Sequence, residues 1–266
     1  PASAGPSVPN GKTFFAKMRD RMVDISCQGL HGDNTISVVV TPENVRELVD
    51  TQRPGFIQSR LRCRGPAPRA PTENDVHGTC DAAVAKNAAW RCEAPEFGKG
   101  LSDFLPYAQV MLRPLMECQK QNILVLGLGG GTISSYLRTK CPGSNVLTVD
   151  NNPNVLRAAR DFFAFKGDAM IEDVHKALSK LSTKAATFDA IVTDVGHNIH
   201  LDKKDLKNVV QLLKPDGVIM ENLSTPSFAE EQMALFKDFL GDVSQEISGT
   251  NHFIFGHLRP SKMMEQ

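Results

Sequence analysis

The sequence has no excess of charge of either sign and no long hydrophobic run. Its 30 lysine and arginine residues balance 30 aspartate and glutamate residues over a length of 266. Nothing suggests a nucleic-acid or membrane partner attracted by bulk charge, so we expect neither. No apolar run approaches the roughly 20 residues needed to cross a bilayer, and no signal-like segment is present. The removal of an upstream leader stays open, because the chain begins at Pro1.

The six cysteines lack the Cys-x-x-Cys spacing of zinc and redox sites, so no metal is expected. Cys63, Cys80 and Cys92 lie in a stretch rich in proline and alanine, and the other three are dispersed. Reduced thiols in a cytoplasmic enzyme are the favoured interpretation. The alternative is a protein of the secretory pathway in which disulfides tie the 63–92 segment. The sequence does not determine the pairing.

Residues 122–150 are the stretch around which the chain is organised. An apolar run ends in a glycine cluster formed by Gly127, Gly129, Gly130 and Gly131. A helix-like segment and a second apolar run follow, and the second run ends at Asp150. Glycines let the backbone approach a ligand or adopt positive φ, and the next helix directs its N–H groups to the same point. Asp150 could accept hydrogen bonds from both hydroxyls of a ribose. The stretch predicts a nucleoside-binding half-site, with an ordinary tight turn as the alternative.

Helix-like and strand-like segments alternate through the last two thirds of the chain. Apolar spacings of three and four predict helices over 100–118, 153–163, 174–181, 203–213 and 229–240. Strands are expected at 123–126, at the run that ends at residue 150, and at 165–172, 188–193, 218–220, 243–247 and 252–258. This order predicts an α/β fold with a Rossmann-like, seven-stranded, mostly parallel sheet and a C-terminal antiparallel hairpin.

The first hundred residues predict a smaller module. A short amphipathic helix is expected over 13–23, and residues 64–100 are expected to form a long irregular insertion. Between them, strands at 36–40, 45–49 and 56–61 suggest a small antiparallel β-hairpin module. We therefore divide the chain into a flexible tail (1–11), the β module with its insertion (12–100) and the α/β domain (101–266).

Acidic residues follow three of the expected strands, at the carboxyl ends where such sheets bind ligands. These residues are Asp150, Asp173 and Asp194. Asp168 competes with Asp173 for the position after the third strand, because the apolar run there is short. Asp173 is also a plausible helix N-cap. Glu221 and Asn222, after the fifth strand, are further pocket candidates. Together with the glycine turn, these residues outline a nucleoside pocket and its reaction edge.

Five segments carry a family resemblance: LVLGLGGGTISSYL, LTVDNNPNVLRAARDFFAF, IEDVHKAL, FDAIVTDV and LLKPDGVIMENL. They resemble the spermidine-synthase-like branch of S-adenosylmethionine-dependent methyltransferases, including the lysine and N-terminal methyltransferase-like proteins. The similarity covers roughly residues 101–260, and RELVDTQRPGFIQSRL weakly resembles the N-terminal β-hairpin module of that branch.

The resemblance implies S-adenosylmethionine as the cofactor and S-adenosylhomocysteine as its product. From the methionine end to the adenine, it assigns the cofactor to Gly127, Gly129 and Gly131, then Asp150 and Asn151, then Asp173 and Val174. Positions near the cofactor or substrate in the family match Gln58, Tyr107 and Asp194.

Aminopropyltransferases of this branch carry an aspartate within the glycine turn, where this chain has Gly130. They also carry Asp-Ser-Ser-Asp-Pro after the fourth strand, where this chain keeps Asp194 and has His197 in place of the second aspartate. A polyamine is a chain of cations and needs a line of carboxylates. With two of the three missing, polyamine aminopropyl transfer is the disfavoured alternative.

Methyl transfer needs less from the protein, because the sulfonium already activates the methyl group and alignment with exclusion of water does most of the rest. Asp194 and His197 are the candidate catalytic residues, with a surface-loop role as the alternative for His197. We expect a methyltransferase that acts on an amine or other nucleophile of a small molecule or protein, and a homodimer. A catalytically silent protein that binds a partner through the insertion is the alternative from another class.

Overall fold

The structure is a computed structural model that describes residues 23–27, 36–40, 44–50, 57–65, 92, 95–97, 106–117, 119, 121–184, 186–196, 199–223 and 226–258. The predicted tail and most of the predicted insertion lie outside these ranges. The helix expected over 13–23 also lies outside them, apart from Val23, which begins a strand instead.

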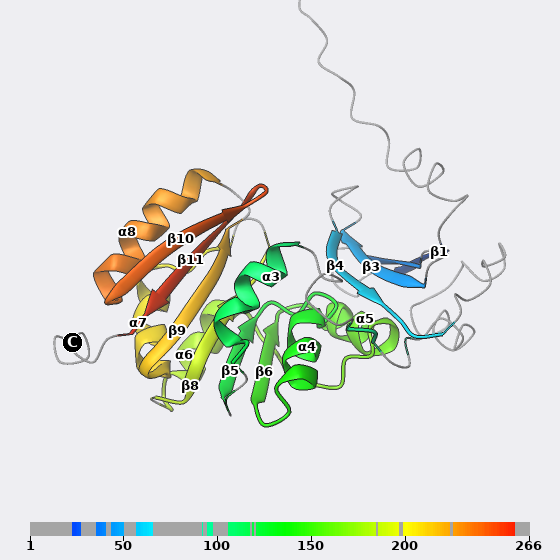
Figure 1. Cartoon of the computed structure of the whole chain (residues 1–266), viewed down its shortest axis with the longest axis horizontal. Coiled ribbons are helices and arrows are strands. Elements are labelled where there is room, and N and C mark those ends of the chain that lie inside the picture. Colours follow the sequence, from blue (N-terminus) through cyan, green and yellow to red (C-terminus); the bar gives the residue numbers. More distant parts are fainter. Residues whose placement is uncertain are drawn as a thin grey trace, which may run out of the picture.

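A seven-stranded sheet forms the core of the larger domain, as the sequence predicts (Figure 1). Its strands are β5 (Asn122–Leu126), β6 (Asn145–Asp150), β7 (Asp168–Ile171), β8 (Phe188–Thr193), β9 (Leu213–Leu223), β10 (Asp242–Ser248) and β11 (Asn251–His257). The order is β10-β11-β9-β8-β5-β6-β7, with parallel pairing from β9 to β7 and an antiparallel β10–β11 hairpin. Because β6 and β8 flank β5, the strand order reverses at β5, where sheets of this kind bind ligands.

Helices cover both faces of this sheet (Figure 1). α3 (Pro106–Leu112) and α4 (Thr132–Lys140) bury apolar residues against one face. The other face is covered by α6 (Val174–Leu181), α7 (Lys203–Leu212) and α8 (Ala229–Phe239). The four apolar residues of β5 are fully buried, as expected for a parallel strand covered on both sides. Within the described chain, no helix is long and apolar enough to cross a membrane.

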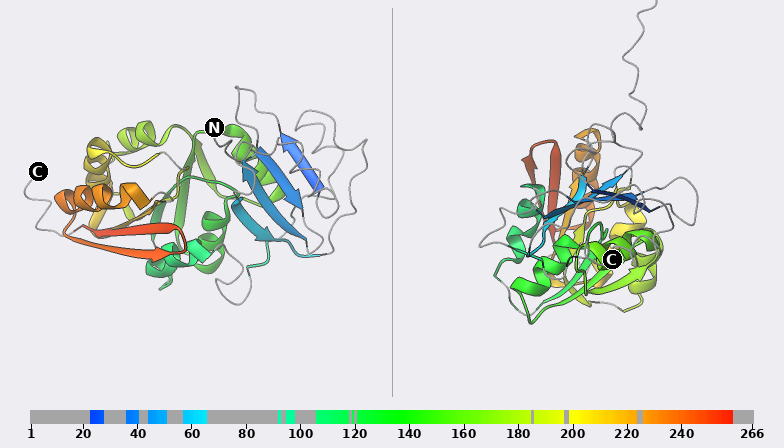
Figure 2. Two further views of the ribbon diagram at one scale, coloured as in Figure 1. Left: turned by 90° about the horizontal axis from the view of Figure 1, so that it is seen from above. Right: turned by 90° about the vertical axis from the view of Figure 1, so that its right-hand side faces the viewer.

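The smaller module is a four-stranded antiparallel sheet that lies beside the larger domain (Figure 2). Its strands, in spatial order, are β1 (Val23–Cys27), β2 (Ile36–Val40), β3 (Val45–Asp50) and β4 (Ile57–Arg62). The sequence predicts the last three and misses β1. Val38, Leu48 and Leu61 of this sheet share a buried core with α5 (Pro153–Phe162), which joins the module to the larger domain.

Two boundaries differ from the prediction because of local backbone chemistry. The described part of the helix expected over 100–118 gives way to a 3-10 turn, η4 (Arg113–Leu115), since Pro114 has no N–H for the helical ladder. β9 begins at Leu213, well before the strand expected at 218–220, and so includes the Lys-Pro-Asp-Gly sequence at 214–217. Asp216 there has a φ of 63°, and the pairing with β8 shifts register, so this part of β9 is an irregular strand.

Three cysteines, at positions 63, 92 and 141, are disulfide-bonded in the described part of the chain. Cys63, which follows β4, is bonded to Cys92, and their Cα atoms lie 5.5 Å apart. Cys141 is also disulfide-bonded, and no described cysteine side chain is free. The interpretation of these cysteines as reduced thiols is therefore wrong, and the alternative of a tied 63–92 segment is correct. Residues 95–97, which come shortly after Cys92, run along the end of β4, where Pro95 is paired with Cys63. Phe97 packs edge-on against Tyr136 of α4, with 5.7 Å between the ring centroids.

Candidate functional site

The carboxyl ends of the central strands meet at one edge of the large sheet. Leu126 at the end of β5 is paired with Val149 of β6 and Thr193 of β8, and Thr193 is paired with Glu221 of β9. The glycine turn, Asp150, Asp173 and Asp194 all follow strands at this edge. Asp168 instead begins β7, at the opposite end of the strands. Of the two competing aspartates, Asp173 is therefore the one at the carboxyl edge, and its role at the site stays a prediction.

Three glycines of the turn are required by close approach and positive φ. A Cβ on Gly127, at φ 96°, would lie 2.1 Å from the carbonyl oxygen of Asp194. A Cβ on Gly129, at φ 51°, would lie 2.5 Å from Oγ of Ser59 in β4. Gly131, at φ 71°, is the N-cap residue of α4. The turn is thus held tightly between the end of β8 and the N-terminal sheet.

Gly130 has a different explanation from the one that the sequence suggests. A Cβ on it would lie 2.7 Å from the buried ring of Phe163, in the core beneath α5. Its N–H donates to Oγ of Ser59 at 2.8 Å. Packing alone therefore requires glycine at this position. A side chain there would enter that core, so the absence of a carboxylate at residue 130 does not report on the substrate.

Asp150 is fixed by the backbone of two turns. Its carboxylate accepts hydrogen bonds from the N–H groups of Leu128 (2.9 Å), Asn152 (2.9 Å) and Gly129. These bonds lower the pKa of Asp150, but burial raises it by more. Asn151 beside it is exposed. The glycine turn and the carboxylate expected to bind the ribose thus form one hydrogen-bonded unit.

Asp173 and Val174 have structural roles of their own. The Asp173 carboxylate accepts a hydrogen bond from the N–H of Lys176 at 3.1 Å and so caps α6. Val174 is 6% exposed and belongs to the main core. Ile171, which ends β7 at the carboxyl edge and is 41% exposed, is a further pocket candidate by its place at that edge. Sequence reasoning missed it because it counts as part of an apolar strand.

Asp194 lies at the centre of a polar cluster drawn from four elements. Nδ2 of Asn222, in β9, donates to Oδ1 of Asp194 at 2.9 Å. The Tyr107 hydroxyl, from α3, also hydrogen-bonds Asp194 and lies 3.2 Å from the carbonyl oxygen of Gln58 in β4. Burial raises the pKa of Asp194, and these two hydrogen bonds lower it by less. Burial and the Asp194 charge hold the pKa of Tyr107 well above its usual value, so Tyr107 remains a proton donor.

The structure thus brings together most of the predicted residues. His197 lies outside the described residues, so its catalytic role stays a prediction. His200, later in the same loop, stacks on Phe228 at 5.0 Å. No group of three or more potential metal-binding side chains occurs among the residues that the structure describes. Ser59 and Asn222 make contacts that no local pattern reveals, although the sequence makes Asn222 a pocket candidate by its place after the strand expected at 218–220.

A cavity of about 310 Å³ lies at the other edge of the sheet. Its lining includes Asn122, Asn145, Asp168 and Phe188, each of which begins a strand. Open parallel sheets bind ligands at the opposite, carboxyl edge, and the glycine turn and Asp194 are both there. We therefore place the functional site at the carboxyl edge.

Comparison with known proteins gives matches in both sequence and fold. Residues 123–217 match a family described as "Methyltransferase domain". The chain is 33% identical over 126 residues to the eEF1A lysine and N-terminal methyltransferase of Xenopus laevis, over 41% of this chain and 18% of that protein. It is 28% identical over 155 residues to the polyamine aminopropyltransferase of Vibrio vulnificus (strain CMCP6), over 52% of this chain and 50% of that protein.

Among solved structures, human methyltransferase-like protein 13 in complex with SAH superposes with a TM-score of 0.51 at 21% identity. The match covers 59% of this chain and 84% of that one. The chain spans less than a fifth of the length of its amphibian relative. The resemblance found in the sequence is confirmed: over this domain the chain is similar in sequence to methyltransferases of this branch and shares their fold.

Proposed function

We propose that this methyltransferase domain transfers a methyl group from S-adenosylmethionine to an amine of a protein or small molecule. The observation that carries the proposal is the convergence of the glycine turn, Asp150 and Asp194 at one edge of the sheet, inside the matched region. The amphibian relative is named for methylation of lysine and N-terminal amines of eEF1A, and we extend the amine nucleophile, not that partner, to this chain.

The residues of the turn fit such a cofactor. Gly127 and Gly129 hold the glycine turn at the carboxyl edge of the sheet, and the first turn of α4 directs its N–H groups to that edge. Asp150 is held at the end of β6, where its carboxylate could accept hydrogen bonds from ribose hydroxyls. When bound, the cofactor supplies a methyl group that its sulfonium has already activated. The protein then has to align the nucleophile and exclude water.

We assign to Asp194 the role of binding and orienting the nucleophile of the substrate. Asn222 and Tyr107 fix its carboxylate from two sides, so it has a defined orientation before substrate binds. A carboxylate so placed can accept a hydrogen bond from an amine N–H and orient the nitrogen lone pair toward the methyl group. Its raised pKa suits it to take up a proton from an ammonium group. His197 is the second candidate for that proton.

Calorimetric titration of the purified chain with S-adenosylmethionine and S-adenosylhomocysteine tests this function. We expect both to bind at one site. No binding at millimolar ligand would contradict the proposal and favour the catalytically silent alternative.

Polyamine aminopropyl transfer is the second candidate, because a bacterial aminopropyltransferase matches half of this chain. His197 in place of a carboxylate argues against it, since polyamines need several carboxylates. Incubation with S-adenosylmethionine and candidate acceptors, followed by mass spectrometry, distinguishes the two. Methyl transfer adds about 14 Da to the acceptor, whereas aminopropyl transfer adds about 57 Da, as the atoms transferred require.

We further propose that the protein works in an oxidising compartment rather than in the cytoplasm. The support is the oxidised state of Cys63, Cys92 and Cys141, because such bonds persist mainly in secreted proteins and the secretory pathway. Alkylation of the native protein before and after reduction, followed by mass spectrometry, tests this. Alkylation of these three residues without reductant would contradict it. The homodimer stays a prediction for analytical ultracentrifugation.

A further inference from the structure

We propose that Glu221 is a positioning residue: with Gln232, it holds Leu201 and thereby the loop that begins at Asp194. We call the described residues 194–196 and 199–202 the reaction loop. The inference rests on the proposed function, in which Asp194 faces the substrate. It assigns a role to a buried carboxyl group that the proposed methyl transfer does not use.

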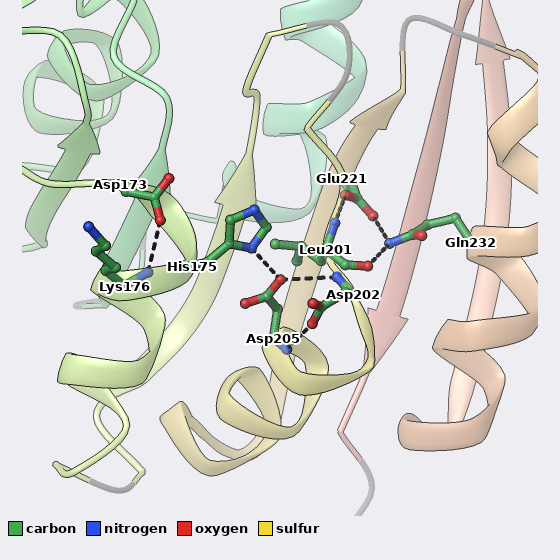
Figure 3. A network of polar contacts seen from close by, with 8 residues as sticks. All are labelled: Asp173, His175, Lys176, Leu201, Asp202, Asp205, Glu221 and Gln232. Carbon is green, nitrogen blue, oxygen red and sulfur yellow. Dashed lines mark hydrogen bonds and ion pairs between the residues drawn. The ribbon is translucent and has the colours of Figure 1, made fainter.

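Three hydrogen bonds form the contact (Figure 3). The N–H of Leu201 donates to Oε1 of Glu221 at 3.2 Å. Nε2 of Gln232, in α8, donates to Oε2 of Glu221 at 2.8 Å and to the carbonyl oxygen of Leu201 at 2.9 Å. All three residues are at most 2% exposed. Both backbone polar groups of Leu201 are thus satisfied by one glutamate and one glutamine, which fixes the loop where it enters α7.

The two ends of the reaction loop are held by consecutive residues of β9. Glu221 holds Leu201 on the face that α7 and α8 cover, and Asn222 holds Asp194 on the other face at 2.9 Å. Successive residues of a strand point to opposite faces, so one strand end can hold both ends of a loop. A shift of the Leu201 end would therefore change the path of the loop toward Asp194.

An ionisable group at this position makes the contact sensitive to pH. Burial raises the pKa of Glu221, the bonds from Leu201 and Gln232 lower it by less, and the nearby charge of Asp205 adds a smaller rise, so that the net pKa is about 7. Asp205, in α7, is paired with His175 of α6 at 2.6 Å, and its other contact is the N–H of Asp202. The group of α8 that faces Glu221 is the neutral side chain of Gln232. Within the sheet, Glu221 is paired with Thr193 of β8 and with Ile254 of β11, and neither side chain is charged.

The direction of the effect follows from the donors. Both Leu201 and Gln232 present N–H groups to Glu221, so the ionised carboxylate satisfies them best. Protonation places a hydrogen on an oxygen that already accepts one of these bonds. These hydrogen bonds are therefore strongest above pH 7 and weaken below it, although the larger cost of burying the charge makes the folded chain as a whole less stable at the higher pH.

Hydrogen exchange of the whole chain, measured by mass spectrometry at about pH 6 and about pH 8, tests this without a substrate. After correction for the chemical exchange rate, we expect the Leu201 amide to exchange about tenfold faster at the lower pH, as when a bond to a charged group is weakened. Glu221→Gln cannot ionise, and its amide would meet the N–H of Gln232. This variant should exchange fast at both pH values.

Glu246→Gln, on the exposed part of β10, is the matched control and should behave as the wild type. Equal corrected exchange at both pH values in the wild-type chain would overturn the proposal, even if Glu221→Gln failed to fold. Unchanged exchange in a folded Glu221→Gln would overturn it as well. Calorimetry with S-adenosylhomocysteine tests the proposed function separately. If the cofactor product did not bind, the proposed function would fail, but the exchange experiment on Leu201 would still test the role of Glu221.

Discussion

Replacement of Asp150 by alanine should weaken the binding of S-adenosylmethionine more than any comparable change elsewhere in the domain. Asp150 is the last residue of β6, and its carboxylate accepts hydrogen bonds from the N–H groups of Leu128, Gly129 and Asn152. The variant loses the acceptor for the ribose and also the bonds that fix the glycine turn. Hydrogen bonds to a charged acceptor contribute about 1 to 3 kcal/mol, so we expect a roughly 5- to 150-fold higher Kd.

The assay is isothermal titration of wild type and variant with S-adenosylmethionine and S-adenosylhomocysteine. Asp168→Ala is the matched control, because Asp168 lies at the opposite end of its strand and is 86% exposed. Its affinity should equal that of the wild type. If Asp150→Ala bound the cofactor within twofold of the wild type, the ribose would be held elsewhere. If Asp168→Ala weakened binding equally, the site would not be at the carboxyl edge.

Three further predictions concern stability in urea. Burial raises the pKa of Glu221 from 4.5 to about 7, so between these values the folded state binds a proton that the unfolded state has lost. The contribution of this group to stability should therefore fall by roughly 3 kcal/mol as pH rises, and a dependence retained in Glu221→Gln would refute this. Gly130→Ala should cost about 1 to 3 kcal/mol, because its Cβ would lie 2.7 Å from an aromatic ring, whereas Gly196→Ala, with nothing within 4 Å, should be neutral. Cys92→Ser should cost about 2 to 4 kcal/mol, because the bond closes a loop with a sequence separation of 29, and an equally stable variant would show that the bond does not constrain the chain.

The sequence predicts an element well where one local signal is sufficient. Helix α6 and strand β8 are predicted to the residue. In α6, apolar residues recur at helical spacing and Asp173 provides the N-cap, so the start, the end and the buried face follow from ten residues of sequence. The glycine turn and Asp150 are predicted in the same way, because strand, turn, helix and acidic residue follow one another along the chain.

Contacts between distant segments could not be predicted. Asp194 and Asn222 are 28 residues apart, and Tyr107 and Gln58 are 49 apart. They meet only because strand order and register place them at one edge. Gly130 shows the same limit, since the residue that excludes a side chain there is the distant Phe163.

The cysteine pairing depends on tertiary structure too. Six cysteines allow many connectivities, and no spacing selects one. Cys63 and Cys92 meet because the segment after Cys92 returns along β4, where Glu96 N–H donates to the Arg62 carbonyl at 2.8 Å. No short stretch of sequence encodes that return.

A crystal structure of the chain with bound S-adenosylhomocysteine tests the central claim most directly. We predict the ligand at the carboxyl edge, with its ribose hydroxyls within hydrogen-bond distance of Asp150 and its sulfur on the side of Asp194. A ligand in the cavity at the opposite edge, among Asn122, Asn145 and Asp168, would contradict the account, as would crystals that take up no ligand at millimolar concentration.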